Sequence, residues 1–298
     1  MSRLSRKQIL LIAAGVYLGV LILLVALTGW KSHRSSFQPQ NEFKLDTWVS
    51  LGIFSINKAV LYLVLAGVLT SASMLYIARR MRQRPNRVQT AVEVVFGLMR
   101  DNIVFGNMDR DTAAKWFPFI GTLFLFILFS NLIGYIPLPT NTESEINVFG
   151  AHIPAFSLYA ATANLSIPLV LALVVFISYT TEGIRAHGVI GYLKTLIPAG
   201  IHGGMAVFIF ILEVISNFMR LMSLSIRLFA NILAGHLIIL FMAGALAVIL
   251  GIAALGWITL PLGIALYAFE VGLVAALQAF IFATLTAIYI GGAVGDSH

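Results

Sequence analysis

Long apolar runs separated by short charged segments form the main pattern of this chain. Several runs carry no charge over about 20 residues, and a helix of that length crosses the roughly 30 Å hydrocarbon layer of a bilayer. Because every backbone polar group must be satisfied within that layer, we expect a bundle of membrane helices. The runs predict about six hydrophobic helices: between residues 7 and 31, between 58 and 79, at about 116–139, at about 156–181, over about 45 residues from 204, and at about 260–292.

The segment from 88 to 105 is amphipathic rather than uniformly apolar. Apolar positions recur with helical spacing, but Glu93, Arg100 and Asp101 interrupt the run and would be unfavourable inside hydrocarbon. The pattern therefore predicts a helix that lies at the membrane interface and does not cross the membrane.

The predicted helix that starts near Gly204 is too long for one upright crossing. No proline interrupts the chain between Pro198 and Pro261, and about 45 helical residues would extend close to 70 Å. Either this helix breaks near a glycine, such as Gly235 or Gly244, or it lies steeply tilted in the membrane. We expect the last two helices to be long and tilted.

Composition narrows the fold class to a membrane protein. Hydrophobic residues make up 59% of the chain and charged residues 10%, against roughly a quarter charged in a soluble domain, and the mean hydropathy is +0.95. Cysteine is absent, which excludes disulfides, thiolate nucleophiles, cysteine-bound zinc and iron–sulfur clusters. These features exclude a water-soluble globule and predict an all-α polytopic membrane protein, with residues 1–298 forming a single membrane domain.

The net charge of +7 comes largely from one short loop with five arginines: Arg79, Arg80, Arg82, Arg84 and Arg87. Such a cluster beside a span indicates which side of the membrane the loop occupies, and it is not the pattern of a nucleic-acid surface. We therefore expect no nucleic-acid partner and assign the loop to the cytoplasm. Counting crossings from this loop puts residues 31–58 and 141–152 outside and the C-terminus inside.

Charged residues inside apolar helices are the features most informative about function. After residue 194 the chain carries five residues of the Asp, Glu, Lys and Arg type: Glu213, Arg220, Arg227, Glu270 and Asp296. All but the last lie within apolar runs, where an arginine at mid-membrane costs about 2.5–3.5 kcal/mol. Such buried charged residues need an interaction partner, contact with water or a functional role.

One narrow polar stripe runs along the long predicted helix. At 100° per residue, five polar residues fall within about 40° of Arg227 around the helix axis: Glu213, Ser216, Arg220, Ser223 and Asn231. His236 falls about 180° away, so the helix presents polar groups to two environments, as a protein needs when it keeps two half-paths apart. In the structural alternative, Glu213 and Arg220 form an ion pair and Arg227 reaches toward the headgroups.

On the last predicted helix, Glu270 and Gln278 are the outstanding polar groups. A lone glutamate in hydrocarbon is a candidate functional residue, whereas Gln278 could equally hold helices together. The two residues are eight positions apart, which places them about 80° apart on a regular α-helix. A shared face would require a local bulge or a tilt.

Two motifs give the sequence a family resemblance. The segment Ser223-Leu-Ser-Ile-Arg-Leu-Phe-Ala-Asn-Ile-Leu-Ala-Gly-His236 closely resembles the signature helix of the a-subunit of F-type ATP synthases, and Leu277-Gln-Ala-Phe-Ile-Phe282 resembles that family's last helix. The resemblance extends in order over about residues 42–292 and includes Gln89-Thr-Ala-Val-Glu93 and Ser130-Asn-Leu-Ile-Gly134. Residues 1–35 match no part of the family pattern, so we interpret them as an extra N-terminal helix before an a-subunit-like region at 36–298.

The resemblance implies roles for the polar residues of the stripe. Arg227 is similar to the family's essential arginine, which faces a rotating ring of proteolipid subunits at the boundary between two aqueous half-channels. Glu213, Ser223 and Asn231 would line polar routes beside this arginine.

The resemblance also implies an exchanged pair in the outer half-channel, which would contain His236, Glu270 and Gln278. Some family members carry a glutamate where this chain has His236, and a histidine on the last helix where this chain has a glutamate. The exchange preserves one carboxylate and one imidazole. Glu270 lies one residue further from Gln278 than in the usual pattern, which would use the position of Val271.

The implied function is that of a proton-translocating stator subunit of ATP synthase in a bacterial inner membrane. Its partners would be the proteolipid ring, peripheral stalk subunits and the lipid bilayer. The sequence contains no Gly-rich phosphate loop and no carboxylate pair with metal spacing, so we expect no bound nucleotide, metal or cofactor and no catalysis by this chain alone.

The residues also allow a self-contained ion-coupled secondary transporter or channel, which could use a buried relay of arginine, glutamate and histidine. A transporter often shows internal repeats, and this sequence shows none. An intramembrane hydrolase is a weaker alternative, because no serine and histidine stand in a nucleophile motif.

The orientation can be tested with single cysteines, because the chain has none of its own. In intact cells, an impermeant maleimide should label a cysteine at Ser144 but not one at Asn86 or Ser297, since the arginine loop is expected inside. Permeabilised cells, in which all three sites should react, provide the control. The reverse pattern would overturn the predicted topology.

Overall fold

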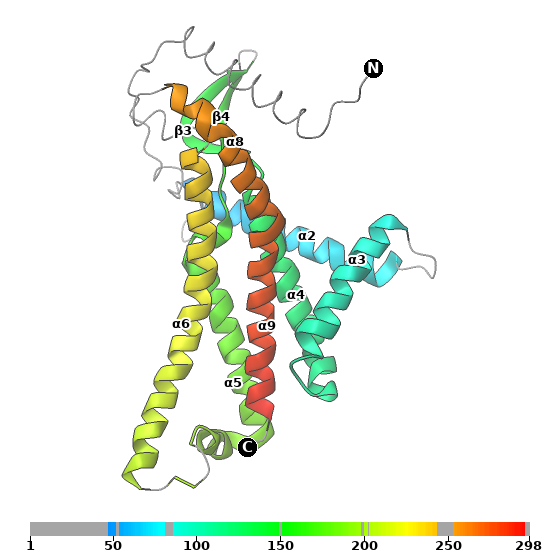
Figure 1. The fold of residues 1–298 in the computed structure, drawn as a ribbon, viewed down its shortest axis with the longest axis vertical. Coiled ribbons are helices and arrows are strands. Elements are labelled where there is room, and N and C mark those ends of the chain that lie inside the picture. The colour runs from blue at the N-terminus through cyan, green and yellow to red at the C-terminus, as the bar shows by residue number, and fades with distance from the viewer. Residues whose placement is uncertain are drawn as a thin grey trace, which may run out of the picture. The chain divides into compact units, whose positions relative to one another are not determined.

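The structure is a computed structural model that describes residues 47–51, 54–80, 86–148, 151–197, 200–201, 203–242 and 253–295. Figure 1 shows the order of the elements along the chain. Two compact units are present: residues 45–233 with 271–298 form the larger, and residues 1–44 with 234–270 form the smaller. The first predicted helix, between residues 7 and 31, lies outside the described residues.

Apart from two short hairpins, the described chain is helical. The long helices are α2 (Lys58–Arg80), α4 (Arg110–Gly134), α5 (Ser166–Thr195), α6 (Gly204–Leu240), α8 (Ala253–Phe269) and α9 (Ala275–Val294), with a π-helical turn η5 (Glu270–Val274) joining the last two. Among the described residues, five stretches are long and apolar enough to span a membrane: Lys58–Arg79, Arg110–Gly134, Ser166–Thr195, Gly204–Leu240 and Thr259–Val294. The prediction of an all-α polytopic membrane protein is confirmed, and these stretches correspond to the last five predicted helices.

The amphipathic segment is helical, as predicted. It consists of α3 (Arg87–Gly97) and a π-helix, η2 (Leu98–Val104). Met99, Ile103 and Val104 are buried while Arg100 and Asp101 are exposed, so the apolar side of η2 packs inward and its charges face outward. Its place at the membrane surface stays a prediction, as does the tilt of the last two helices.

The helix α4 begins earlier than the sequence pattern predicted, at Arg110 and not near Trp116. Asp109 caps its start: one carboxylate oxygen accepts a hydrogen bond from the backbone N–H of Thr112 at 3.0 Å, which satisfies one of the free donors of the first turn. The same hydrogen bond lowers the pKa of the Asp109 carboxyl. The cap explains why charged residues before the apolar run are already helical.

The helix α5 begins later than predicted, at Ser166 and not near residue 156. The residues before it form a hairpin of β3 (Leu138–Val148) and β4 (Ala151–Ser157), followed by a single 3-10 turn, η3 (Ala161–Ala163). The Asn164 side chain accepts a hydrogen bond from the Ser166 backbone N–H at 3.1 Å, which fixes the start of the helix. A second hairpin, β1 (Thr47–Leu51) with β2 (Phe54–Asn57), precedes α2.

A kink near the end of α5 turns the chain back onto the bundle. Gly188 has φ +73°, a conformation that side-chain-bearing residues avoid. Beyond the kink, the ring of Tyr192 lies against Gly183, where a Cβ atom would approach it to 2.6 Å. This turn brings Tyr192 next to the side chains that α5 presents before the kink.

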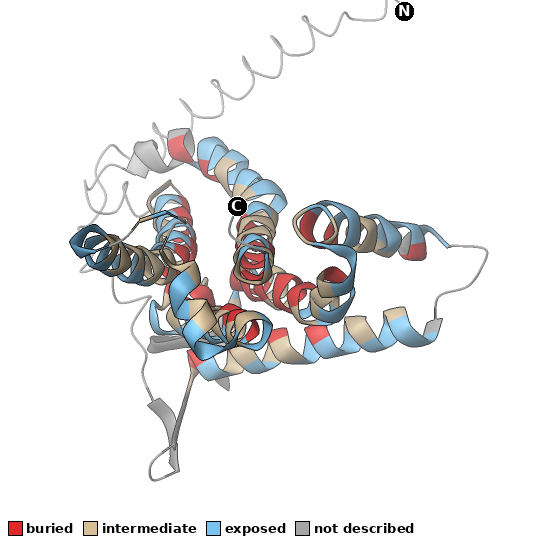
Figure 2. Ribbon diagram, turned by 90° about the horizontal axis from the view of Figure 1, so that it is seen from below, coloured by how far each residue is buried: buried red, intermediate tan, exposed pale blue. Residues whose placement is uncertain are grey.

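The core of the larger unit is built around α9, which packs against α4 and α5, while α2 packs against α4. Buried residues, red in Figure 2, gather where helices face one another, and the outward faces are exposed. The buried face of α9 carries alanine at every fourth position: Ala275, Ala279, Ala283 and Ala287. Such small residues allow membrane helices to approach closely.

A buried hydrogen-bond chain fixes the start of α9 to α4. The Asn131 amide donates to the carbonyl oxygen of Ala275 at 3.2 Å and accepts from the Thr162 hydroxyl at 2.8 Å. Asn131 and Thr162 are fully buried, and in a site without water such paired polar groups hold helices in one register. The Ser130–Gly134 motif thus connects three elements of the larger unit.

Candidate functional site

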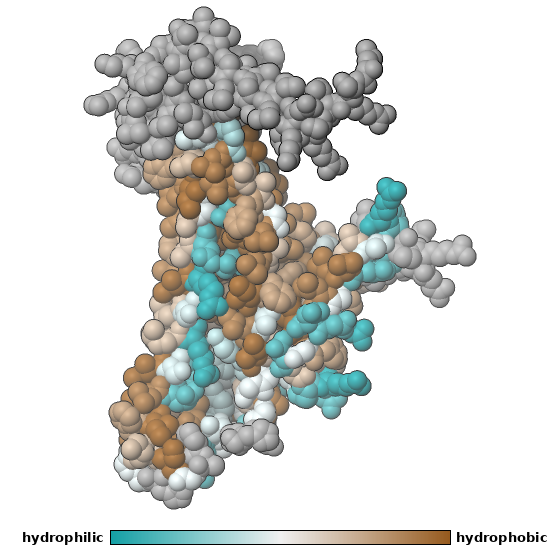
Figure 3. Space-filling model, viewed as in Figure 1, coloured by the Kyte–Doolittle hydropathy of each residue, from teal (hydrophilic) through white to brown (hydrophobic). Residues whose placement is uncertain are grey.

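The polar stripe predicted on the long helix lies on an unbroken α-helix. α6 is continuous from Gly204 to Leu240 and does not break at Gly235, whereas Gly244 lies outside the described residues. Residues at the predicted angles therefore share one side of the helix. Figure 3 shows a hydrophilic band along α6 between hydrophobic surfaces.

Arg227 lies on the exposed part of this stripe. Its neighbours on the stripe, Ser223 and Asn231, are exposed as well, and so is the adjacent apolar Ile226, at 46%. Among the described residues, no hydrogen bond or ion pair to the Arg227 side chain is found. The guanidinium thus sits on an outer surface of a helix that is otherwise suited to hydrocarbon.

The structure brings Arg227 and Gln278 together. Both line one small cavity between α6 and α9, whose other walls are apolar. Gln278 is only 6% exposed, on the buried side of α9. The amide is therefore held inside the bundle beside the base of the arginine.

A polar cavity of about 580 Å³ lies further along the stripe, among α5, α6 and α9. Glu213 and Arg220 line it, and Arg220 Nη2 lies 3.0 Å from Glu213 Oε1. The Arg220 guanidinium also lies over the ring of Tyr289, 5.9 Å from its centre. The ion pair foreseen as the structural alternative is therefore present, and it forms one wall of a space large enough for water.

Two residues of this cavity were missed by sequence reasoning. The Tyr179 hydroxyl donates to the Asn217 side-chain oxygen at 3.2 Å, and the Asn217 amide donates to the Glu213 backbone carbonyl at 3.1 Å. Arg220 Nη1 also donates to the Asn217 oxygen, at 3.5 Å. Asn217 could have been found, because it follows Glu213 by one helical turn. Tyr179 could not, because it comes from another helix.

In the smaller unit, Glu270 lies directly against α6. A Cβ atom built on Gly235 would be 2.5 Å from Glu270 Oε2, so only glycine leaves room for the carboxylate in this position. The next residue, His236, is 2% exposed. The structure therefore brings Glu270 to the segment that carries His236.

The local bulge that a shared face of the last helix would require is also present. η5 begins at Glu270 and ends at Val274, and it is π-helical. A π-turn closes its hydrogen bonds five residues apart and contains one residue more than a regular turn. The extra residue in the spacing from Glu270 to Gln278 therefore coincides with a wide turn.

A comparison with protein families identifies the family of the chain. The model of the family described as "ATP synthase A chain" matches residues 60–291. The chain belongs to the ATP synthase A chain family. Membership confirms the resemblance carried by the two helix motifs and assigns the chain to the membrane sector of ATP synthase, with a role in ATP synthesis and proton transport.

Individual relatives cover most of the chain. The ATP synthase subunit a of Rubrobacter xylanophilus is 37% identical over 79% of this chain and 83% of its own length. The subunit a of Bradyrhizobium diazoefficiens is 32% identical over 87% of this chain and 98% of its own length. The subunit a of Rhizobium rhizogenes is 35% identical over 86% of this chain and 96% of its own length. Together with the five spans, these relatives identify an integral membrane protein and a subunit of the ATP synthase complex.

The contact between Gly235 and Glu270 predicts a functional defect without a folding defect. In Gly235→Ala the new methyl group would collide with the end of a flexible side chain, so the carboxylate moves and the helices stay in place. We expect normal amounts of assembled complex but ATP-driven proton pumping reduced several-fold in inverted vesicles. Gly67→Ala adds the same methyl group to a membrane helix in open space and should pump normally; equal pumping by both variants would contradict the assignment.

Proposed function

We propose that this chain is the proton-translocating stator subunit of an F-type ATP synthase, with two aqueous half-channels separated by Arg227. The observation that carries the proposal is the exposed Arg227 on a spanning helix, in a narrow polar stripe with Ser223 and Asn231 that apolar surface such as Ile226 borders. An arginine facing lipid is unfavourable, so this face has to meet a partner that offers a negative charge or water. A ring of proteolipid subunits with a carboxyl group at mid-membrane is such a partner.

The arginine acts on that carboxyl group through its charge. A carboxyl group that crosses lipid has to be neutral, whereas one beside a guanidinium is stabilised as an anion. The guanidinium itself stays protonated at any accessible pH. Arg227 therefore favours release of the proton from each arriving ring site, and its fixed positive charge blocks direct leakage of protons between the two routes.

The inner route follows the polar cavity on α6. Glu213, Asn217 and Arg220 line a space of about 580 Å³, and Ser223 continues the stripe toward Arg227 with Asn231 beyond it. Water in this cavity accepts the released proton, and the Glu213–Arg220 pair supplies charged groups that hold such water. The tyrosine–asparagine hydrogen bond sets the position of Asn217 in the wall of the route.

The outer route uses His236, Glu270 and Gln278. The close approach of the Glu270 carboxylate to Gly235 supports pairing it with His236. The π-turn that begins at Glu270 supplies one residue more than a regular turn, which matches the extra residue in the spacing from Glu270 to Gln278. This route protonates the ring site before that site enters lipid.

Coupling requires the whole complex. One proton crossing 100 mV contributes about 2.3 kcal/mol, so several proton transfers have to be combined by rotation for each ATP formed. The chain itself catalyses no reaction and binds no nucleotide; peripheral stalk subunits hold it against the ring. It lies in a bacterial inner membrane with its C-terminus in the cytoplasm.

Replacement of Arg227 tests the proposal. Arg227→Ala should insert normally, because it removes a charge that hydrocarbon disfavours, and should abolish ATP-driven proton pumping in inverted vesicles. Arg227→Lys should fail almost as completely, since a lysine in such a site can lose its proton. Ile226→Ala, at the neighbouring exposed position, serves as the control. Near-normal pumping by either arginine variant would contradict the proposal.

A double exchange tests the outer route. His236→Ala and Glu270→Ala should each slow proton flow, and the double variant His236→Glu with Glu270→His should recover part of it, because one acid and one imidazole are kept. Pumping rates of these three variants are compared with that of the unaltered chain, because residues that work together show non-additive effects. If the exchange is no better than the worse single variant, the two residues do not work as a pair.

A further inference from the structure

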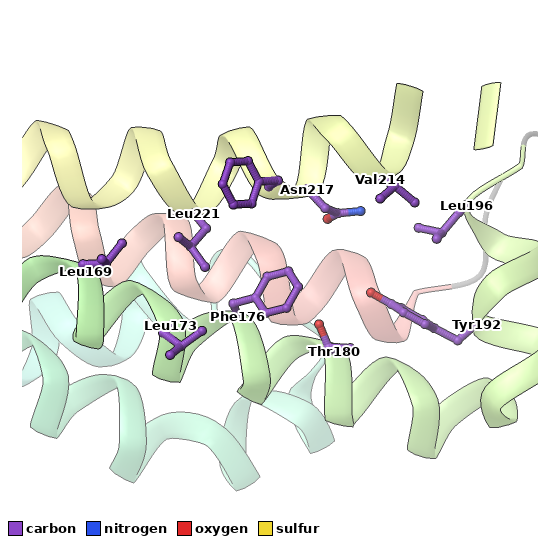
Figure 4. A pocket seen from close by; sticks show the side chains of 10 residues that line it. Leu169, Leu173, Phe176, Thr180, Tyr192, Leu196, Val214, Asn217 and Leu221 are labelled. Carbon is purple, nitrogen blue, oxygen red and sulfur yellow. The ribbon is translucent and has the colours of Figure 1, made fainter. Parts of the chain in front are cut away.

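An apolar groove lies between α5 and α6 in the larger unit (Figure 4). Its volume is about 500 Å³, and its walls are mostly leucine, phenylalanine and valine side chains. On α5 the lining runs from Leu169 to Thr180, about 16 Å along the helix, which is about half of the hydrocarbon thickness. The groove is therefore about as long as one leaflet of a bilayer.

The two ends of the groove differ in polarity. Leucines from both helices, Leu169 and Leu221 among them, form one end, whereas at the other Thr180, Asn217 and Tyr192 bring oxygen and nitrogen atoms among apolar side chains, which include Val214 and Leu196 (Figure 4). This gradient suits an amphiphilic molecule with a long apolar part and a polar region.

A basic residue lies close in sequence to the polar end. Lys194 is two residues beyond Tyr192, in the last turn of α5, and it is exposed. Lys194 belongs to the short segment beyond the kink at Gly188, near the end of the apolar span, and a lysine at such a span end attracts lipid phosphate. Charge complementarity thus favours a phospholipid.

The groove is also continuous with the lipid-facing surface of the spans. Val170 and Val174 on α5 and Ile215 on α6 are exposed beside it. A second membrane helix would pack best on small residues, but the lining contains no glycine, alanine or serine. A flexible acyl chain fits walls of large apolar side chains better, because it can follow their shape and keep van der Waals contact.

We propose that this groove binds one glycerophospholipid, with an acyl chain along the leucine end and its phosphate toward Lys194. Asn217 and Tyr192 line both this groove and the polar cavity, so the lipid adjoins the inner route without being part of it. An acyl chain in the groove keeps water of the cavity from spreading between α5 and α6. This lipid site goes beyond the proposed function, which uses only the polar cavity that Asn217 and Tyr192 also line.

Photocrosslinking tests this site in the intact complex. The purified complex is placed in vesicles of phosphatidylcholine and phosphatidylglycerol in which one acyl chain of the phosphatidylglycerol carries a diazirine. The complex is then extracted from the vesicles with detergent, washed and irradiated. The crosslinked peptides are mapped by mass spectrometry. Crosslinks to the half-buried lining residues Phe176 and Leu221 should persist through washing, whereas those to the exposed Val170 should disappear.

Variants locate the lipid. Leu173→Trp fills the groove and should reduce the retained crosslinks at least five-fold, whereas Val174→Trp, on a neighbouring face of α5, should leave them unchanged. Lys194→Gln should reduce retention of phosphatidylglycerol. The comparison of lining and exposed residues in the unaltered chain stands even if a variant fails to fold, and it measures lipid retention independently of proton flow.

Two outcomes would overturn the proposal. Equal loss of crosslinks at Phe176 and Val170 during washing would mean that the groove holds only exchangeable bulk lipid. Crosslinks from groove residues to another protein chain, with no lipid retained, would mean that a subunit helix occupies it.

Discussion

A charge that cannot be neutralised, on a helix that has to lie in hydrocarbon, is the constraint on which the rest of this structure depends. The Arg227 guanidinium keeps its proton under all accessible conditions, so it cannot become neutral as a lysine or a carboxyl group would. It lies on an exposed polar stripe of α6 that apolar surface borders, and Arg227 and Gln278 line one small cavity. In the proposed function, a partner whose own charge opposes that of the arginine completes this face.

The fold could largely be predicted, because uncharged runs of membrane length have few alternatives to a spanning helix. The errors fell at helix ends. α4 was predicted to begin near Trp116 because charged residues precede the apolar run, yet the Asp109 cap makes those residues helical. α5 was predicted to begin too early, because apolar residues that form β4 read as part of the span.

The part of the candidate site that lies on a single helix could be predicted from the sequence. The stripe on α6 follows from angular spacing alone, and the eight-residue spacing on the last helix indicated that a shared face would need a bulge or a tilt; a bulge, η5, is present. Contacts between helices could not be found this way. The hydrogen bond from Tyr179 to Asn217 and the contact of Gly235 with Glu270 depend on how distant segments approach each other, and angular spacing contains no information on that.

The alanine face of α9 has a mechanical consequence. Alanine has no side-chain torsion that could switch between rotamers, so the alanine face of α9 cannot itself yield by rearranging side chains. A sideways load on α9 is passed to α4 across this face, and the buried hydrogen bond from Asn131 to Ala275 resists sliding along the helix axis. Under torque from a rotating neighbour, α4 and α9 would move together as a rigid unit, while the larger side chains of α6 remain free to change rotamer.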